Sequence, residues 1–228
     1  MTVRLLSYSQ PTKEFADMGI ADAQELIAYC ARVSNPSNQL STETSEKLIR
    51  YLVKHQHWSP LEMVSACLEI TTTRDIARQI LRHRSFSFQE FSQRYADPTK
   101  DLNFVLREAR LQDTKNRQNS VELTMDTPEQ RKLAMDWVKA QQRVTLAAKE
   151  SYEWAIANGI AKEQARAVLP EGLIESRLYM NGTLRSWIHF IELRSANGTQ
   201  KEHQQIAIAC ANAIANIFPM AAGLVIHD

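Results

Sequence analysis

The stretch LEMVSACLEITTT, residues 61–73, indicates the fold more directly than any other part of the sequence. Apolar and polar or small side chains alternate along it, with Val64, Ala66, Leu68 and Ile70 on one side. Successive side chains of a β-strand point to opposite faces of its sheet. The alternation therefore predicts a strand with one buried face.

Helical periodicity begins directly after this strand, in TRDIARQILRHR (residues 73–84), and it recurs in most of the remaining sequence. The same reading predicts strands at residues 3–9 and 173–180, and helices at residues 21–34, 41–56, 128–157, 161–170, 183–194 and 201–218. Thr127 and Pro128 form a helix start, and Asn158-Gly159 forms a helix end. Residues 107–127 are polar and aperiodic, so we expect a long loop there.

The composition is typical of one globular domain, residues 1–228, in which helix predominates. The chain has 27 Lys and Arg against 26 Asp and Glu, which argues against a general nucleic-acid or membrane binder. Six glycines are few for this length and favour helices over tight turns. The three cysteines are widely spaced, and the sequence shows neither a signal peptide nor an apolar run long enough to span a membrane. We therefore expect a soluble protein of the reducing cytoplasm.

One stretch combines charge and aromatic rings in an unusual way: RHRSFSFQEFSQRY, residues 82–95. It holds three arginines, one histidine, three serines and four aromatic residues. Arg74 and Arg78 precede Arg82 at helical spacing, so three cations lie along one flank and need anions to compensate them. Guanidinium groups bind phosphate bidentately, which favours an anion site. A charged helix end followed by a surface loop is an equally good reading of the same residues.

Two other chemistries are weighed and disfavoured. Ser92 with His83 could form a nucleophile and base, but no Gly-any-Ser-any-Gly turn surrounds the serine. His55 and His57 could bind a metal, but no acidic or cysteine cluster accompanies them, and we expect no metal. His203 and His227 are expected to be exposed.

The spacing within residues 82–95 resembles the signature of flavin-dependent thymidylate synthases. That signature is Arg-His-Arg, seven residues, then Ser-any-Arg; here it reads from Arg82 to Arg94 without a gap. Three other elements resemble the family in the same order: HWSPLE (57–62), ARAVLP (165–170) and TLRSWIHFIELR (183–194). Gln200 and Glu202 stand where the next helix of the family begins, Met63 replaces a frequent histidine, and NGTLR (181–185) replaces a frequent Asn-Ala-Arg.

The resemblance implies an α+β fold with a central, mostly antiparallel sheet flanked by helices, and a homotetramer with active sites shared between subunits. It also implies the reductive methylation of dUMP to dTMP. The carbon donor would be 5,10-methylenetetrahydrofolate, FAD would carry the hydride, and NADPH or a related nicotinamide cofactor would be the reductant. Several anions then converge on one pocket, which explains local arginines in a nearly neutral chain.

The resemblance also implies a role for each matching residue. Arg194 would favour ionisation of the uracil ring at N3 and so act in catalysis. Flavin contacts would come from His57, Ser59, Arg82, His83, Arg84, Glu90, Thr183, Leu184, Arg185 and His189. Nucleotide contacts would come from Gln79, Arg82, Glu90, Phe91, Ser92, Gln93, Arg94, Arg166 and Arg194, with Ser92 and Arg94 at the phosphate.

The cysteines agree with a flavin-dependent reaction, because none looks like a nucleophile. Cys30 and Cys210 lie on apolar helix faces and Cys67 lies within the strand, without an arginine or histidine adjacent in sequence. The main alternative is a non-catalytic nucleotide- or RNA-binding module that uses residues 82–95, and the near-zero net charge counts against it. An inactive structural relative is a further alternative, disfavoured by the intact Arg94 and Arg194.

Overall fold

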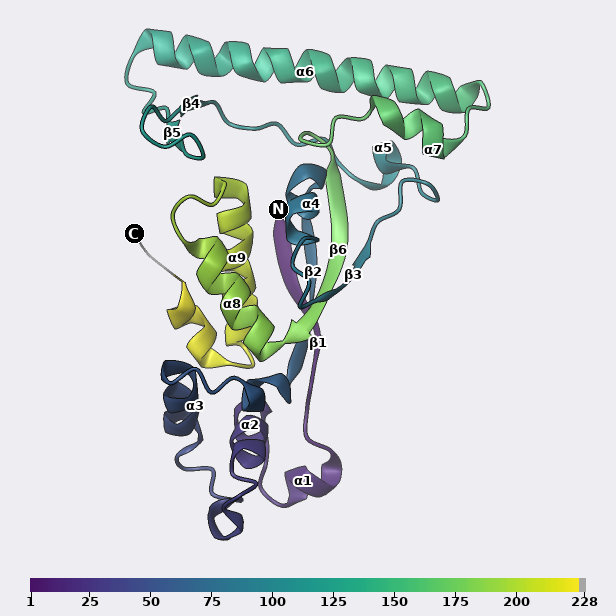
Figure 1. Cartoon of the computed structure of the whole chain (residues 1–228). Helices are drawn as coiled ribbons and strands as arrows, with labels where there is room; N and C mark the ends of the chain where they lie inside the picture. The colour runs from purple at the N-terminus through teal and green to yellow at the C-terminus, as the bar shows by residue number, and fades with distance from the viewer. Residues whose placement is uncertain (226–228) are drawn as a thin grey trace.

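A four-stranded antiparallel sheet forms the centre of the computed structural model, which describes residues 1–225 (Figure 1). Its strands follow the spatial order β1 (Thr2–Tyr8), β2 (Ser65–Thr73), β6 (Glu175–Thr183) and β3 (Ser87–Glu90). Every neighbouring pair is antiparallel. The expectation of a mostly antiparallel sheet is therefore confirmed.

Strand β2 shows why the sheet has one buried face. Ala66, Leu68 and Ile70 are fully buried, whereas the residues between them are half-exposed. The register places Leu68 opposite Met180 and Ile70 opposite Leu178 on β6, so two central strands contribute matching apolar rows. The alternation read from residues 61–73 is confirmed, although the strand itself begins at Ser65.

Two C-terminal helices cover the buried face of the sheet: α8 (Leu184–Ser195) and α9 (Lys201–Ala215) (Figure 1). Trp187 of α8 is almost fully buried there, and its indole N–H donates to the backbone oxygen of Ala66 at 3.0 Å. That hydrogen bond satisfies the polar atom of the ring inside the core. The Trp187 hydrogen bond thus fixes the position of α8 relative to the centre of β2.

Shorter helices join these main elements. They are α1 (Lys13–Asp17), α2 (Ala23–Ala31), α3 (Ser45–Lys54), α4 (Arg74–Ile80), α5 (Pro98–Asp101) and α7 (Lys162–Ala165), with 3₁₀ turns at Pro36–Asn38, Ser59–Glu62, Arg166–Val168 and Pro219–Leu224. Asp22 caps α2 by accepting from the backbone N–H of Glu25 at 2.8 Å. Within residues 1–225, no helix is both long and apolar enough to cross a membrane.

Helix α6 (Pro128–Ala157) is the longest element and lies across one end of the molecule (Figure 1). It begins as predicted, with the Thr127 hydroxyl accepting from the backbone N–H of Gln130 at 3.2 Å. It ends before Gly159, whose φ of +78° suits glycine. Most of its length is exposed, and four of its residues are buried: Gln141, Ala148, Tyr152 and Ala155.

Three predictions of local structure were wrong. Residues 82–95 were read as a helix end and a loop, but residues 87–90 form β3, the edge strand beside β6. Residues 107–127 were read as a loop, but they contain a hairpin of β4 (Arg110–Gln112) and β5 (Ser120–Glu122). The helix read over residues 73–84 ends at Ile80.

Candidate functional site

The turn that follows α4 meets α8 through one hydrogen bond between two residues of the expected site. Arg194, near the C-terminal end of α8, donates from Nε to Nε2 of His83 at 2.9 Å. His83 also packs edge-on against Phe190, with ring centroids 5.0 Å apart. The core helix α8 therefore holds both groups in place, although 111 residues separate them in sequence.

The His83–Arg194 contact requires a neutral histidine. Burial, together with the charge of Arg194, lowers the pKa of His83 from 6.5 to about 4. Because Arg194 donates to Nε2, the proton of the neutral ring resides on Nδ1. Burial and the neighbouring charge of Arg82 also lower the pKa of Arg194.

In the described part of the chain, no carboxylate pairs with the arginines at this junction. Within residues 1–225, neither Arg82 nor Arg84 forms an ion pair or a side-chain hydrogen bond, and both are exposed. Arg82 nevertheless lies close enough to Arg194 to act on its charge. Like charges held together without compensation favour binding of an anion.

Gln79 lies one helical turn before His83 and connects α4 to α9. Its Nε2 donates to Oε1 of Gln200 at 2.9 Å, and its Oε1 lies 3.2 Å from Nδ1 of His203. His203 is fully buried, so the expectation that it is exposed was wrong. The ring fills the space between Phe190 and His83, with centroids 5.8 and 6.3 Å away. His227 lies outside the described residues.

Glu90 is placed inside the protein rather than on a loop. It is the last residue of β3, accepts from the Ser176 hydroxyl at 2.7 Å and lies 3.5 Å from a guanidinium nitrogen of Arg74. Glu171 compensates Arg74 and Arg78 at 3.4 and 3.3 Å. Of the three arginines on this helical flank, the first two are therefore paired with carboxylates.

The second half of the signature lies against α7 and the turn that follows it. Arg94 is exposed and forms an ion pair with Glu163 at 3.4 Å, and Arg166 donates to the backbone oxygen of Glu163 at 3.3 Å. Ser92 accepts from the backbone N–H of Arg94 at 3.4 Å. Gln93 is buried, and its Nε2 finds no hydrogen-bond partner within residues 1–225. Phe91 is half-buried, and its N–H donates to the backbone of β6.

The start of α8 collects the remaining expected residues. Thr183 caps the helix, accepting from the backbone N–H of Ser186 at 3.3 Å. Leu184 is fully buried in the core, so its side chain is not exposed to a bound molecule. Arg185 forms a close ion pair with Glu62, and the exposed His189 packs on Trp58 at 4.5 Å. His57 and Ser59, on either side of Trp58, are exposed as well.

One chain thus separates the expected site into groups. Gln79, His83 and Arg194 lie at the junction of α4, α8 and α9. Arg194 bonds to His83 there, and Gln79 bonds to the start of α9. Ser92, Arg94 and Arg166 are tied to α7, and the residues around Trp58 are tied to the start of α8. In the described part of the chain, neither hydrogen bonds nor ion pairs join these groups.

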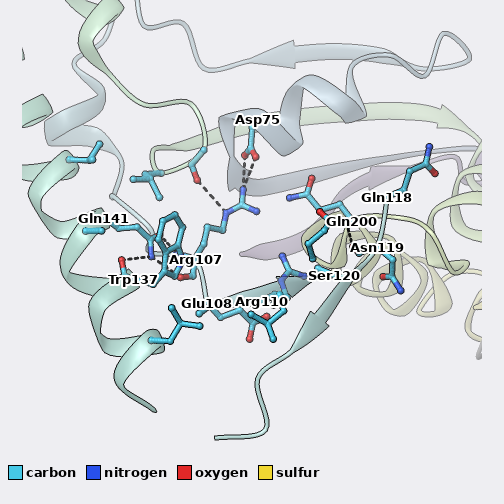
Figure 2. A pocket seen from close by; sticks show the side chains of 18 of the residues that line it. Asp75, Arg107, Glu108, Arg110, Gln118, Asn119, Ser120, Trp137, Gln141 and Gln200 are labelled. Carbon is cyan, nitrogen blue, oxygen red and sulfur yellow. Dashed lines mark hydrogen bonds and ion pairs between the residues drawn. The ribbon is translucent and has the colours of Figure 1, made fainter. Parts of the chain in front are cut away.

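An open pocket of about 840 Å³ lies between α6, the β4–β5 hairpin and the N-terminal end of α9 (Figure 2). Figure 2 shows the guanidinium of Arg107 pointing at Asp75, which accepts at 2.7 Å. Arg107 also lies 3.0 Å from Glu202, and Arg110 lies 2.5 Å from the other oxygen of that carboxylate. Among described residues, this pocket is not lined by residues 82–95.

This ion-pair network has only a weak signal in the sequence. Arg107 and Arg110 fell in the segment predicted to be a loop, and Glu202 is 92 residues away from Arg110. Burial alone would raise the pKa of Glu202, but hydrogen bonds from Arg110 and its own backbone N–H, with the charge of Arg107, lower it overall. The available signal was two arginines at i and i+3 in an otherwise aperiodic stretch.

Residues 1–225 contain neither a metal-binding cluster nor a cysteine with a lowered pKa. No three His, Cys, Asp or Glu side chains are grouped there so that they could hold a metal ion. Burial raises the pKa of Cys30, Cys67 and Cys210. Each thiol is therefore less easily converted into the nucleophilic thiolate.

Comparisons with known proteins agree with this arrangement. The family described as "Thymidylate synthase complementing protein" matches residues 17–220. A "Probable flavin-dependent thymidylate synthase" of Paramecium bursaria Chlorella virus 1 is 45% identical over 96% of each chain. The "Flavin-dependent thymidylate synthase" of Synechocystis is 46% identical over 97% of this chain and 98% of the relative.

A solved structure extends the likeness to three dimensions. The UMP/dUMP methylase PolB of Streptomyces cacaoi, bound with 5-Br dUMP, superposes with a TM-score of 0.78 at 26% identity. The match covers 98% of this chain and 93% of that one. The signature spacing, the antiparallel sheet and these comparisons lead to one conclusion: the chain belongs to the family of flavin-dependent thymidylate synthases.

Proposed function

We propose that this protein is an FAD-dependent thymidylate synthase, a methyltransferase that converts dUMP to dTMP. The observation that carries the proposal is the junction of Arg82, His83 and Arg194, where two guanidinium groups interact and no carboxylate of residues 1–225 pairs with either. Such a site attracts an anion. The names of relatives at 45 and 46% identity, and the dUMP analogue bound to the structural neighbour, identify which anions to test.

The residues present fit FAD, whose pyrophosphate needs cationic donors. Arg82 and Arg84 are exposed and have no carboxylate partner in residues 1–225, so binding the pyrophosphate would break no ion pair there. We propose these two arginines, with His57, Ser59, Arg185 and His189 as further contacts. When bound, FAD supplies the hydride that completes the methyl group. NADPH as reductant and 5,10-methylenetetrahydrofolate as carbon donor belong to the same proposal.

Arg194 would act directly on the nucleotide. Its Nε is committed to His83, and no residue of the described range 1–225 pairs with its two terminal nitrogens, so these would face the pyrimidine. A guanidinium aimed at the ring stabilises the negative charge that develops when N3 loses its proton. His83 would serve as the neutral acceptor that fixes the orientation of this guanidinium.

The nucleotide phosphate would be held by Ser92, Arg94 and Arg166. Arg94 is exposed and paired with Glu163 at 3.4 Å, a contact that a phosphate dianion can replace. Because this group is not joined to the Arg194 junction within one chain, we propose that the two halves meet between subunits of a homotetramer. Exposed apolar residues of α6 support such an assembly: Leu133, Met135, Trp137, Val144, Leu146 and Trp154.

Purified protein tests the proposal in two measurements. The expected protein is yellow, with an oxidised-flavin absorption spectrum, or takes up added FAD, and it forms dTMP from dUMP, methylenetetrahydrofolate and NADPH. Colourless protein that does not bind added FAD would show the proposal to be wrong. Binding of single-stranded RNA without FAD would favour the alternative of a nucleic-acid-binding module.

The assembly is tested separately, through α6. Trp154 is 63% exposed in one chain, so replacing it by glutamine removes apolar contact area without opening the core. We expect Trp154→Gln to reduce the mass measured by light scattering and to reduce dTMP formation in parallel. Lys149→Gln, on the same helix, is the matched control. A variant that stays active as a monomer would refute shared sites.

A further inference from the structure

A chain of hydrogen bonds leads from a buried carboxylate to Gln79 and fixes the direction in which the Gln79 amide points. The chain begins at Glu202, which is 7% exposed and is held by Arg107 and Arg110 at 3.0 and 2.5 Å. With two guanidinium partners, Glu202 is ionised, and an ionised carboxylate can only accept hydrogen bonds. The group that lies next to it must therefore donate.

Gln200 is that neighbour, and its orientation follows. Its Nε2 donates to Oε2 of Glu202 at 2.9 Å, because the opposite amide orientation would place two acceptors together. Its Oε1 is then the atom that faces Gln79 and must accept. Nε2 of Gln79 accordingly donates to Oε1 of Gln200 at 2.9 Å.

The same logic passes through Gln79 to His203. With its Nε2 facing Gln200, Gln79 turns its Oε1 towards Nδ1 of His203, 3.2 Å away, so this nitrogen must carry the proton. The ring is fully buried, which favours the neutral form. His203 is thereby fixed as the Nδ1–H tautomer, and its Nε2 has no hydrogen-bond partner within residues 1–225.

We propose that Gln200 and His203 are positioning residues that lock the side-chain amide of Gln79 in one orientation for the nucleotide. The inference rests on the proposed role of Gln79 as a nucleotide contact. A free carboxamide can turn over and exchange its donor and acceptor ends. In the lock, each end has one protein partner, so the second N–H and the second oxygen lone pair of the half-buried Gln79 always occupy the same places. An acceptor oxygen of the nucleotide then meets an N–H and never the amide oxygen.

A double-mutant cycle on the FAD-loaded protein tests this inference. The measurement is the Kd for dUMP of the wild type, Gln79→Ala, Gln200→Ala and the double variant, with the Kd for FAD as a second readout. We expect Gln200→Ala to weaken dUMP binding about five- to tenfold, the loss of one oriented hydrogen bond, and to leave FAD binding unchanged. In the Gln79→Ala background, Gln200→Ala should have no further effect.

His203→Phe supplies an independent arm, because it keeps a planar ring in the buried site and removes the donor to Gln79. We expect the same selective loss of dUMP affinity. Gln205→Ala, an exposed amide on the same helix, is the control and should match the wild type. Additive effects of Gln79→Ala and Gln200→Ala, or equal weakening of FAD and dUMP binding, would overturn the inference alone. Wild-type protein that binds no dUMP would overturn the proposed function with it.

Discussion

The two halves of the signature differ in how the fold holds them. Arg82 and His83 follow α4, where Arg194 of the core helix α8 donates to His83 and Gln79 bonds to residues at the start of α9. Arg94 lies at an open edge beside α7 and has one ion pair with an exposed carboxylate. The comparison teaches that one chain can preorganise the proposed catalytic half of the site by itself. The proposed phosphate-binding half is left accessible to a ligand or another subunit.

The strongest way to break the junction is to remove Arg194. We expect Arg194→Ala to lower dTMP formation about 10²–10³-fold, because an oriented charge at the developing negative charge is lost. FAD content, measured by absorption, should stay near the wild-type value, since Arg82 and Arg84 remain. Arg177→Ala, an exposed arginine on β6, is a matched control. Unchanged turnover would exclude Arg194 from catalysis.

The second prediction concerns the residue that joins the signature to the core. Phe86 packs against Trp187 with ring centroids 4.8 Å apart, and a Cβ on Gly182 would lie 2.4 Å from the Phe86 ring. Gly182→Ala must therefore displace this ring, which costs about 1–3 kcal/mol of unfolding free energy by overpacking. Urea denaturation measures the change. Gly172→Ala is the control, since its nearest neighbour to an added Cβ lies at 3.9 Å.

A further outcome would sharpen the Gly182 experiment. Phe86→Leu should restore part of the stability lost in Gly182→Ala, because the smaller side chain vacates the position that the new methyl group needs. If the double variant is less stable than Gly182→Ala alone, the ring contact is not the cause of the loss.

These cases show what the sequence could predict. The alternation in β2 and the Thr127 cap of α6 are local signals, and both predictions were confirmed. Residues 85–88 alternate serine and phenylalanine, which is a strand signal for β3 that the charged residues on either side obscure. The hairpin had almost none, because β4 and β5 are three residues each and are largely exposed.

Motif spacing suggested the site residues, but it could not suggest their partners. The family resemblance assigned roles to Gln79, His83 and Arg194, and the structure connects each of them to a partner. Glu202 is the carboxylate that orients the chain of amides. It pairs with Arg107 and with Arg110, which is 92 residues away in sequence. Pairing over such a distance leaves no periodic pattern in the sequence, since it depends on how helices and hairpins pack.

Acid pH should distinguish the closed junction from the open edge. Burial, with the charges of Arg194 and His83, lowers the pKa of His203 from 6.5 to about 3. The unfolded chain then binds a proton that the native protein does not, so stability rises with pH between about 3 and 6.5. We expect the contribution of His203 to the unfolding free energy to be greatest above pH 6.5 and to fall as the pH is lowered, by up to about 1.4 kcal/mol per pH unit. His83, whose pKa is lowered to about 4, adds a slope of the same sign.

A variant isolates the contribution of this histidine. His203→Phe should reduce the slope of unfolding free energy between pH 7 and 5, measured by urea denaturation at each pH, and leave the part that His83 contributes. His55→Asn, which changes an exposed ring, should keep the wild-type slope. Equal slopes in the wild type and His203→Phe would mean that other groups determine the acid sensitivity.

The smallest effect is expected from the thiols, which belong to neither half of the site. Burial raises the pKa of Cys30, Cys67 and Cys210, the opposite of what a nucleophile requires. The combined variant Cys30→Ser, Cys67→Ser, Cys210→Ala should therefore form dTMP within about a fewfold of the wild-type rate, with alanine at the fully buried position to avoid an unpaired hydroxyl. Total loss of turnover in protein that keeps its FAD and its cooperative unfolding would return a thiol to the mechanism, and Arg194 would then no longer suffice to activate the pyrimidine.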